Sequence, residues 1–289
     1  MKYYYGLMFY VLLFSCAEKE EENWTNLIDE NLSKWNTYLS YQHQVGYNGK
    51  VPLDSLGNEI TPIGFNSKAH DVFTTIKKND TLILRISGEY YGSIFTKESY
   101  KNYHFSLKVK WGNKKWGYRK DLLKDSGILY HSIGEPGVEY FRSWMLSQEF
   151  QIMEGHMGDY WSQANSAIDI RAIPPESLIN AVADKNYPFL HFGEGGLKPG
   201  FCLRNSNYES LNNDWTSMEL ICFENKSIHI VNGHVVMILK NSRYIEKSKT
   251  IPLNEGKIQL QSEAGEVFFK DVKIKKLQEL PHQYEKFYD

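Results

Sequence analysis

The stretch that decides the fold class is SMELICFENKSIHIVNGHVVMIL, residues 217–239. Hydrophobic and polar residues alternate along SMELICFE and along SIHIV, which is the period-two pattern of half-buried β-strands. Asn232-Gly233 separates the next two runs, and an Asn-Gly pair favours a type I′ turn because both of its central residues take positive φ. The stretch therefore predicts consecutive antiparallel strands joined by tight turns.

Segments of the same kind recur along the chain. They are TLILRIS (81–87), YHFSLKVKW (103–111), GILYHSI (127–133), SQEFQIME (147–154), KIQLQSE (257–263) and VFFKDVKIKKL (267–277). Many short strands separated by turn residues are typical of an antiparallel β-sandwich. The one helix-like segment is Pro175–Ala183 (PESLINAVA), because a proline suits the first turn of a helix. We therefore expect an all-β fold.

Composition limits the classes of function. The chain is 42% hydrophobic and carries a formal net charge of -2, which excludes a disordered protein and a strongly basic nucleic-acid surface. We therefore expect no nucleic-acid partner. The 20 Tyr and 7 Trp residues suit sugar faces, although most such rings fill the core of a β-sandwich. The length fits one large β domain, which we expect to span residues 23–289.

The first 22 residues, MKYYYGLMFYVLLFSCAEKEEE, indicate where in the cell the protein is located. Lys2 precedes an apolar run that is too short to span a bilayer well, and the run ends at Ser15-Cys16 before an acidic cluster. This pattern is typical of a bacterial lipoprotein signal in which Cys16 is lipidated, and the acidic cluster resembles the surface-export signals of Bacteroidetes lipoproteins. The alternative is an uncleaved N-terminal anchor. Both interpretations predict a protein of the cell envelope, and the first predicts an outer-membrane lipoprotein whose residues 1–22 are signal and tether.

The two other cysteines, Cys202 and Cys222, each lie in a strand-like segment. An oxidising envelope would allow them to form a disulfide. Two buried free thiols are the equal alternative, because the sequence does not place their Cα atoms within bridging distance.

Polar side chains of three predicted strands can share one surface. Alternation places Glu149 and Gln151 on the face opposite Phe150, and it places Gln261 with Gln259 and Glu263. The same reasoning places His131 opposite Ile128 and Tyr130. A solvated outer face is the ordinary interpretation of such a pattern. A curved sheet would instead present these groups to a polyhydroxylated ligand.

The loop GHMGDYW, residues 155–161, follows the strand that carries Glu149. His156 is the candidate general base, because imidazole titrates near neutral pH, although a lone loop histidine is more often a surface residue. Glu154, His156 and Asp159 could alternatively hold a divalent cation such as calcium, but their spacing is no specific metal signature. No cofactor is therefore certain.

Five segments in order resemble the 3-keto-disaccharide hydrolase domain family of Bacteroidetes-type lipoproteins. They are GSIFTKESYKNYHFSLKVKW, DSGILYHS, EFQIMEG, DWTSMELICFENKSIHIVNGHVV and KIQLQSEAGEVFFKDVKIKKL. The resemblance spans roughly residues 27–277. It implies a concanavalin-A-like jelly roll of two antiparallel sheets and a substrate whose glucose unit carries a ketone at C3.

The family's motifs map onto Ser126–Ile128, Glu149–Ile152 and Leu260-Gln261. The chain departs from the family at His131, where an arginine is usual, and in its long connection of residues 172–213. A ketone at C3 acidifies the proton on C2, so a base can start elimination of the C1 substituent, and water can then add.

The expected roles for this chemistry divide into catalytic and substrate-binding residues. His156 would be the base, with Glu149 as its partner or the leaving-group acid and His131 as a third catalytic candidate. Residues expected to bind the carbohydrate are Gln151, Gln261, Glu154, and Trp161 or Tyr140 as the stacking platform.

Two alternatives remain open at this point. A non-catalytic glycan-binding lipoprotein could use the same fold, since fold does not determine function. A retaining glucanase would need two carboxylates about 5 to 5.5 Å apart, and its usual strand motif is absent from the sequence.

Overall fold

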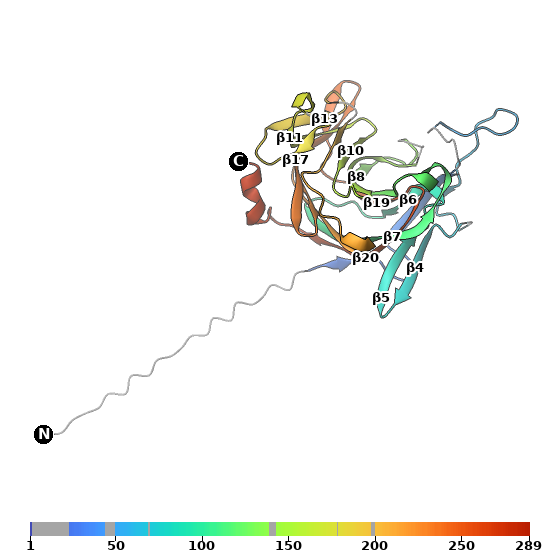
Figure 1. Cartoon of the computed structure of the whole chain (residues 1–289), viewed down its shortest axis with the longest axis horizontal. Helices are drawn as coiled ribbons and strands as arrows, with labels where there is room; N and C mark the ends of the chain where they lie inside the picture. The colour runs from blue at the N-terminus through green and yellow to red at the C-terminus, as the bar shows by residue number, and fades with distance from the viewer. Residues whose placement is uncertain (2–22, 44–49, 69, 139–142, 178, 198–199) are drawn as a thin grey trace.

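The structure is a computed structural model that describes residues 1, 23–43, 50–68, 70–138, 143–177, 179–197 and 200–289. Cys16 and Tyr140 lie outside these residues. The described chain is almost entirely β-structure, arranged in two antiparallel sheets that lie one over the other (Figure 1). The expected all-β jelly-roll sandwich is confirmed.

The larger sheet has twelve strands in the described residues. Their order is β12 (Val182–Ala183), β11 (Ser166–Ile173), β17 (His234–Glu246), β16 (Lys226–Val231), β15 (Thr216–Phe223), β7 (Tyr103–Lys115), β20 (Gly265–Lys276), β5 (Thr81–Ile86) and β4 (Phe73–Lys78), with β1 (Thr25–Asn26), β13 (Phe189–Gly193) and β18 (Lys249–Pro252) paired to β20, β11 and β17.

The smaller sheet has eight strands in the same residues. Their order is β14 (Phe201–Cys202), β10 (Tyr160–Gln163), β9 (Leu146–Met153), β8 (Asp125–Ile133), β19 (Lys257–Ser262), β6 (Tyr90–Thr96), β2 (Trp35–Gln42) and β3 (Gly64–Phe65). The 3-10 turns are η1 (Gly117–Asp121), η3 (Pro175–Ser177), η4 (Leu211–Asn213) and η5 (His282–Phe287).

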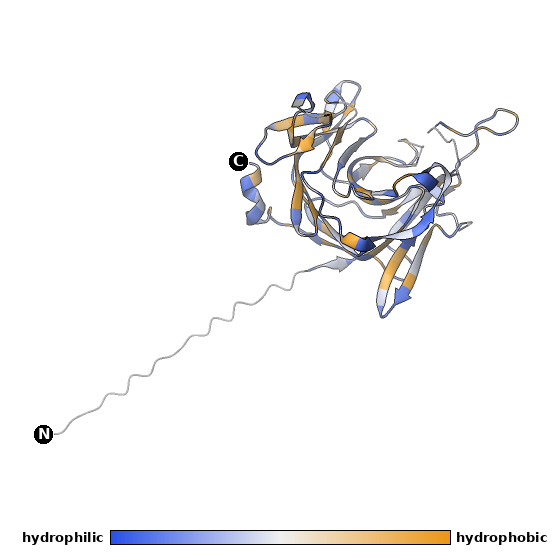
Figure 2. Ribbon diagram, in the orientation of Figure 1, coloured by the Kyte–Doolittle hydropathy of each residue, from blue (hydrophilic) through white to orange (hydrophobic). Residues whose placement is uncertain are grey.

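Alternation along the strands builds the core between the sheets. Hydrophobic residues recur along strands such as β5 and β17, with hydrophilic residues between them (Figure 2). Ile128, Phe150 and Leu260 of the smaller sheet share one buried cluster with Leu220 and Phe269 of the larger sheet. The opposite faces of β8, β9 and β19 are therefore free to carry polar side chains.

The Asn232-Gly233 turn has the predicted geometry. Asn232 has φ 47° and Gly233 has φ 78°, and Val231 pairs with His234 across the turn. The helix predicted at Pro175–Ala183 is wrong beyond its first turn, because Val182 and Ala183 pair as β12 with β11. Tertiary pairing of backbone groups therefore overrides the local helix signal there.

Candidate active site

A pocket of about 460 Å³ lies on the face of the smaller sheet that points away from the core. We call it the groove pocket, and its lining residues are Arg119, Asp125, Trp144, Glu149, Gln151, Met153, Trp161, Ser162, Gln163, Gln261 and Glu263. Its volume lies in the range of small-molecule sites. The pocket brings together Glu149, Gln151, Gln261 and Trp161, which are four of the residues expected to act on or bind the carbohydrate.

Gly127 on β8 lets two of these side chains approach each other. A Cβ atom at Gly127 would lie 2.3 Å from Oε1 of Gln261 and 2.5 Å from Oε1 of Glu149. Any other residue at this position would therefore displace the amide, the carboxylate or both. The glycine of the Ser-Gly-Ile segment thus has a local steric reason.

Gln261 is the most unusual polar group in the groove pocket. Its side chain is 1% exposed, and neither amide atom has a hydrogen-bond partner in the described part of the chain. An unpaired buried polar group costs about 1–3 kcal/mol, so native proteins rarely keep one without a reason. The amide is therefore suited to receive a hydrogen bond from a ligand and to donate one to it.

Glu149 on β9 is buried beside Gln261 and is held from the other side by β10. The Nε2 atom of Gln163 donates a hydrogen bond to Oε2 of Glu149. Trp161 is the register partner of Glu149, and its ring lies against Phe201 with 4.5 Å between the ring centroids. A carboxylate and a large ring therefore line the same part of the groove pocket.

A buried ionic cluster forms another part of the lining. Nη2 of Arg119 donates to Oδ2 of Asp125 and, at 3.1 Å, to Oε1 of Glu263. Burial raises the pKa of Asp125 well above its ordinary value, with repulsion from Glu263 adding to the effect and attraction to Arg119 opposing it. Burial likewise raises the pKa of Glu263 against the attraction to Arg119.

The two carboxylates share one guanidinium and titrate as a pair. Burial disfavours the charged form of Arg119, but Glu263 and Asp125 outweigh it and raise the pKa of this guanidinium. Arg119 therefore stays cationic, and the pair keeps a proton to higher pH than ordinary carboxylates do. Such a pair can donate a proton to a bound ligand.

Four residues of the groove pocket have no role predicted from the sequence, namely Arg119, Asp125, Trp144 and Gln163. Glu263 was placed on the correct face but was given no role. Asp125 could have been found, because it lies two residues before Gly127 on the same face of β8. Arg119 belongs to the turn η1, where no strand period indicates its direction.

His156 and Glu154 lie elsewhere, in the turn that joins β9 to β10. Nδ1 of His156 is 3.0 Å from Oδ2 of Asp159, and Nζ of Lys124 is 3.1 Å from Oε1 of Glu154. The turn bends towards the larger sheet, because Met157 is part of the shared core. The structure therefore does not bring His156 or Glu154 to Glu149, and their assigned roles stay predictions without support from the geometry.

Of the suggested cation ligands, His156 and Asp159 are in contact, but Glu154 is not part of their cluster. Asp159 accepts hydrogen bonds from Arg204, whereas Glu154 is paired with Lys124. Within the described ranges, no group of three His, Cys, Asp or Glu residues is arranged to hold a metal ion.

His131 faces the core, so its predicted side of the sheet is wrong. The pairing of β8 with β9 and β19 shifts by one residue here, and His131 has φ 52°. This bulge sends His131 towards Tyr103 and Tyr130 and places Ser132 on the groove side, where its hydroxyl accepts from Gln259. Burial lowers the pKa of His131 to about 4.

Comparison with known protein families identifies one family that the chain matches. The family profile described as "3-keto-alpha-glucoside-1,2-lyase-like domain" matches residues 23–275. No curated protein sequence matches the chain.

Three solved structures illustrate the structural likeness. A candidate glycosyl hydrolase from Parabacteroides distasonis ATCC 8503 has a TM-score of 0.46 at 16% identity, over 88% of this chain and 99% of that chain. LamAcat from Zobellia galactanivorans has a TM-score of 0.38 at 13% identity, over 84% and 91%. Carbohydrate-binding module CBM66 from Bacillus subtilis has a TM-score of 0.38 at 9% identity, over 71% and 92%. Likenesses this distant carry no functional inference.

The family match covers both sheets and every groove-pocket residue. The chain therefore belongs to the 3-keto-alpha-glucoside-1,2-lyase-like domain family of carbohydrate-active proteins.

Proposed function

We propose that the groove pocket cleaves glycosides whose glucose unit carries a ketone at C3, by elimination followed by hydration. The observation that carries the proposal is the meeting of Glu149 with the unpartnered amide of Gln261 over Gly127. One group is a proton acceptor, and the other can bind the oxygen on which negative charge develops. Elimination next to a ketone requires this combination.

The first step is removal of the proton on C2. The ketone at C3 makes this proton acidic, and the Glu149 carboxylate accepts it. Gln163 holds the other carboxylate oxygen and so orients Glu149. The C3 oxygen becomes an enolate, which the amide nitrogen of Gln261 stabilises by donating a hydrogen bond. Glu149 thus replaces His156 as the proposed base.

The second step is departure of the C1 substituent. The C1–O bond breaks with its electron pair leaving on oxygen, and the Asp125–Glu263 pair supplies a proton to that oxygen. Arg119 stabilises the additional negative charge that remains on the pair. The sugar then carries a C1=C2 double bond conjugated to the ketone.

Hydration completes the cycle. Water adds its oxygen to C1 and gives a proton to the Asp125–Glu263 pair, while C2 receives a proton from Glu149 after the Glu149 carboxyl has exchanged its proton with solvent. The sum is substrate plus water giving the 3-keto sugar and the free alcohol, and both acid–base groups return to their starting states. Trp161 and Trp144 would cover the faces of the sugar ring.

The test compares 3-keto-trehalose with unoxidised trehalose in D2O, with and without a chelator. We expect wild-type protein to cleave the keto sugar alone and to place deuterium at C2. Glu149→Gln should lower turnover by about 1,000-fold or more because it removes the base. His156→Ala should retain turnover. Cleavage of unoxidised trehalose, product without deuterium, or binding without cleavage would each refute the proposal.

We also propose that the protein is tethered in the cell envelope through a lipid on Cys16, as its first 22 residues indicate. Among the described residues, no helix has the length and hydrophobicity to cross a membrane. Cys16→Ser should move the protein from the detergent phase to the aqueous phase in a detergent partition of cell extracts. Unchanged partition would contradict lipidation at this residue.

A further inference from the structure

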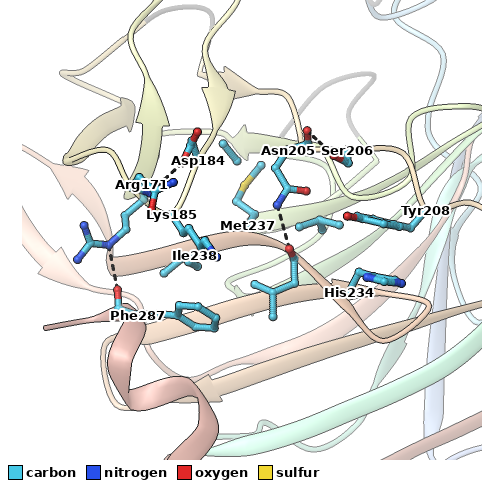
Figure 3. A pocket seen from close by; sticks show the side chains of 14 residues that line it. Arg171, Asp184, Lys185, Asn205, Ser206, Tyr208, His234, Met237, Ile238 and Phe287 are labelled. Atoms are coloured by element: carbon cyan, nitrogen blue, oxygen red, sulfur yellow. Dashed lines mark hydrogen bonds between the residues drawn. The ribbon is translucent and has the colours of Figure 1, made fainter.

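A second pocket, of about 380 Å³, lies on the larger sheet and shares no lining residue with the groove pocket (Figure 3). We call it the β17 pocket, because residues 234–238 at the start of β17 form one side of it. β11 pairs with β17 as far as Ile170 and Leu239, and then turns away to pair with β12. The pocket lies where the two strands separate.

Much of the wall of the β17 pocket comes from the connection of residues 172–213. Asp184 and Lys185 lie on one side, and Asn205 and Tyr208 lie on the other (Figure 3). The pocket is therefore built by this connection together with β17.

Two parallel rings form one end of the β17 pocket. The ring centroids of Tyr208 and His234 are 4.0 Å apart, and the ring planes differ by 4° (Figure 3). His234 belongs to β17, so the sheet fixes the position of the pair. Flat, partly exposed rings that are held in place suit the apolar faces of sugar rings.

Two short polar side chains of the β17 pocket are held in place by hydrogen bonds. Nδ2 of Asn205 donates to the Val235 carbonyl at 3.0 Å, which leaves its amide oxygen on the side of Tyr208 (Figure 3). Oδ1 of Asp184 accepts from the backbone of Asn186 at 2.8 Å, which fixes this carboxylate beside Lys185. Amide, carboxylate and ammonium groups together can bind the hydroxyl groups of a sugar.

The charges argue against an anionic ligand. The guanidinium of Arg171 donates hydrogen bonds to the backbone oxygens of Phe287, Tyr187 and Asp289, at 2.9, 3.1 and 2.9 Å. It therefore supports the wall and is not aimed at a ligand (Figure 3). The remaining cation, Lys185, lies next to Asp184, so the pocket has no cluster of free positive charge.

We propose that the β17 pocket is a second saccharide site that binds one unit of a neutral oligosaccharide on the Tyr208–His234 ring pair. It binds without cleaving, because its lining contains a single carboxylate, Asp184. The site does not depend on the reaction proposed for the groove pocket.

The test uses calorimetric titration of the full chain with maltotriose and laminaritriose, and with trigalacturonate as the acidic alternative. We expect at least one neutral trisaccharide to bind. Tyr208→Ala should weaken that binding by about tenfold or more, since aromatic side chains dominate such contacts. Tyr208→Phe is the matched control and should retain it, because the ring remains.

Two further measurements distinguish the β17 pocket from the groove pocket: trisaccharide binding by Trp161→Ala and turnover of 3-keto-trehalose by Tyr208→Ala. Trisaccharide binding should survive Trp161→Ala, and Tyr208→Ala should turn over the keto sugar at the wild-type rate. The proposal is wrong if neither neutral trisaccharide binds, if Tyr208→Ala binds as wild type does, or if trigalacturonate binds more tightly. A failed cleavage assay with intact Tyr208-dependent binding would refute only the proposed function.

Discussion

At the residue scale, Gln259 and Gln261 differ in whether their side-chain amides have hydrogen-bond partners within the protein. They lie on the same face of β19 and are both buried. Gln259 accepts from Ser93 at 3.0 Å and donates to Ser132 at 2.9 Å, so its amide is satisfied. The amide of Gln261 has no such partners among the described residues. The two positions therefore form a natural pair for comparison.

We predict opposite effects of one substitution at these two positions. Gln261→Leu should leave the free energy of unfolding unchanged or raise it by about 1 kcal/mol, because it removes an unpaired buried amide. It should lower turnover by about 100-fold, the usual effect of losing one oxyanion donor. Gln259→Leu should destabilise the fold, because Ser93 and Ser132 lose their partner. Urea unfolding and aglycone release measure the two effects, and a stability loss in Gln261→Leu as large as that in Gln259→Leu would contradict this prediction.

A second prediction concerns Gly127. The three atoms nearest to the Cβ of Gly127→Ala would all belong to the ends of the Gln261 and Glu149 side chains, so the backbone can stay in place. Turnover should fall by about 100-fold or more while the melting temperature changes little. At Gly92 a Cβ would lie 2.2 Å from the backbone oxygen of Tyr38, so Gly92→Ala should unfold the protein more easily. Thermal melting measures the stability of both variants. An equal loss of stability in the two would show that Gly127 supports the fold and not the position of Glu149 and Gln261.

At the scale of elements, the bulge in β8 explains the main error in the sequence-based site. Strict alternation places His131 on the groove face, but one extra residue in β8 moves it into the core. A bulge depends on how two strands pair, so no period within β8 alone predicts it. The position of His156 was hard to predict for a similar reason. The direction of the turn from β9 to β10 depends on the packing of Met157 in the core, which the local sequence does not specify.

The bulge also predicts how stability depends on pH. His131 is neutral in the fold with a pKa of about 4, and its ordinary value of 6.5 applies to the unfolded chain. The unfolded state therefore binds more protons between these values, so stability is complete above pH 6.5 and falls as the pH falls towards 4. For His131 the loss is at most about 3 kcal/mol.

His131→Asn tests this dependence, because Asn tolerates positive φ and does not titrate. Between pH 7 and pH 4.5, the urea midpoint of the variant should fall less than that of the wild type. Asp125, Glu263 and His229 also change their protonation with pH, but they are present in both proteins. The difference between the two pH profiles therefore reports the titration of His131. Identical pH profiles would contradict the assignment.

At the scale of the whole molecule, the fold was more predictable than the site. The strands around Ile128, Phe150, Leu220 and Leu260 carry a clear period of two, and this period alone separates core from surface. The ionic cluster was harder to predict, because Arg119 reaches Glu263 across 144 residues of chain. Such a contact depends on how distant strands align, which a single sequence does not specify.

In the described residues the two sheets are held together by packing and not by a covalent bridge, and this gives the last prediction. Cys202 lies in β14 of the smaller sheet and Cys222 in β15 of the larger sheet, and both are free and buried. Burial raises the pKa of both thiols, that of Cys222 to about 12, so the folded protein should not react with a thiol reagent at neutral pH. Both thiols should react once guanidinium unfolds a Cys16→Ser variant, and a reductant should leave its melting temperature unchanged. A lower melting temperature in reductant, or fewer than two reactive thiols in the unfolded state, would mean that a bridge contributes to the fold after all.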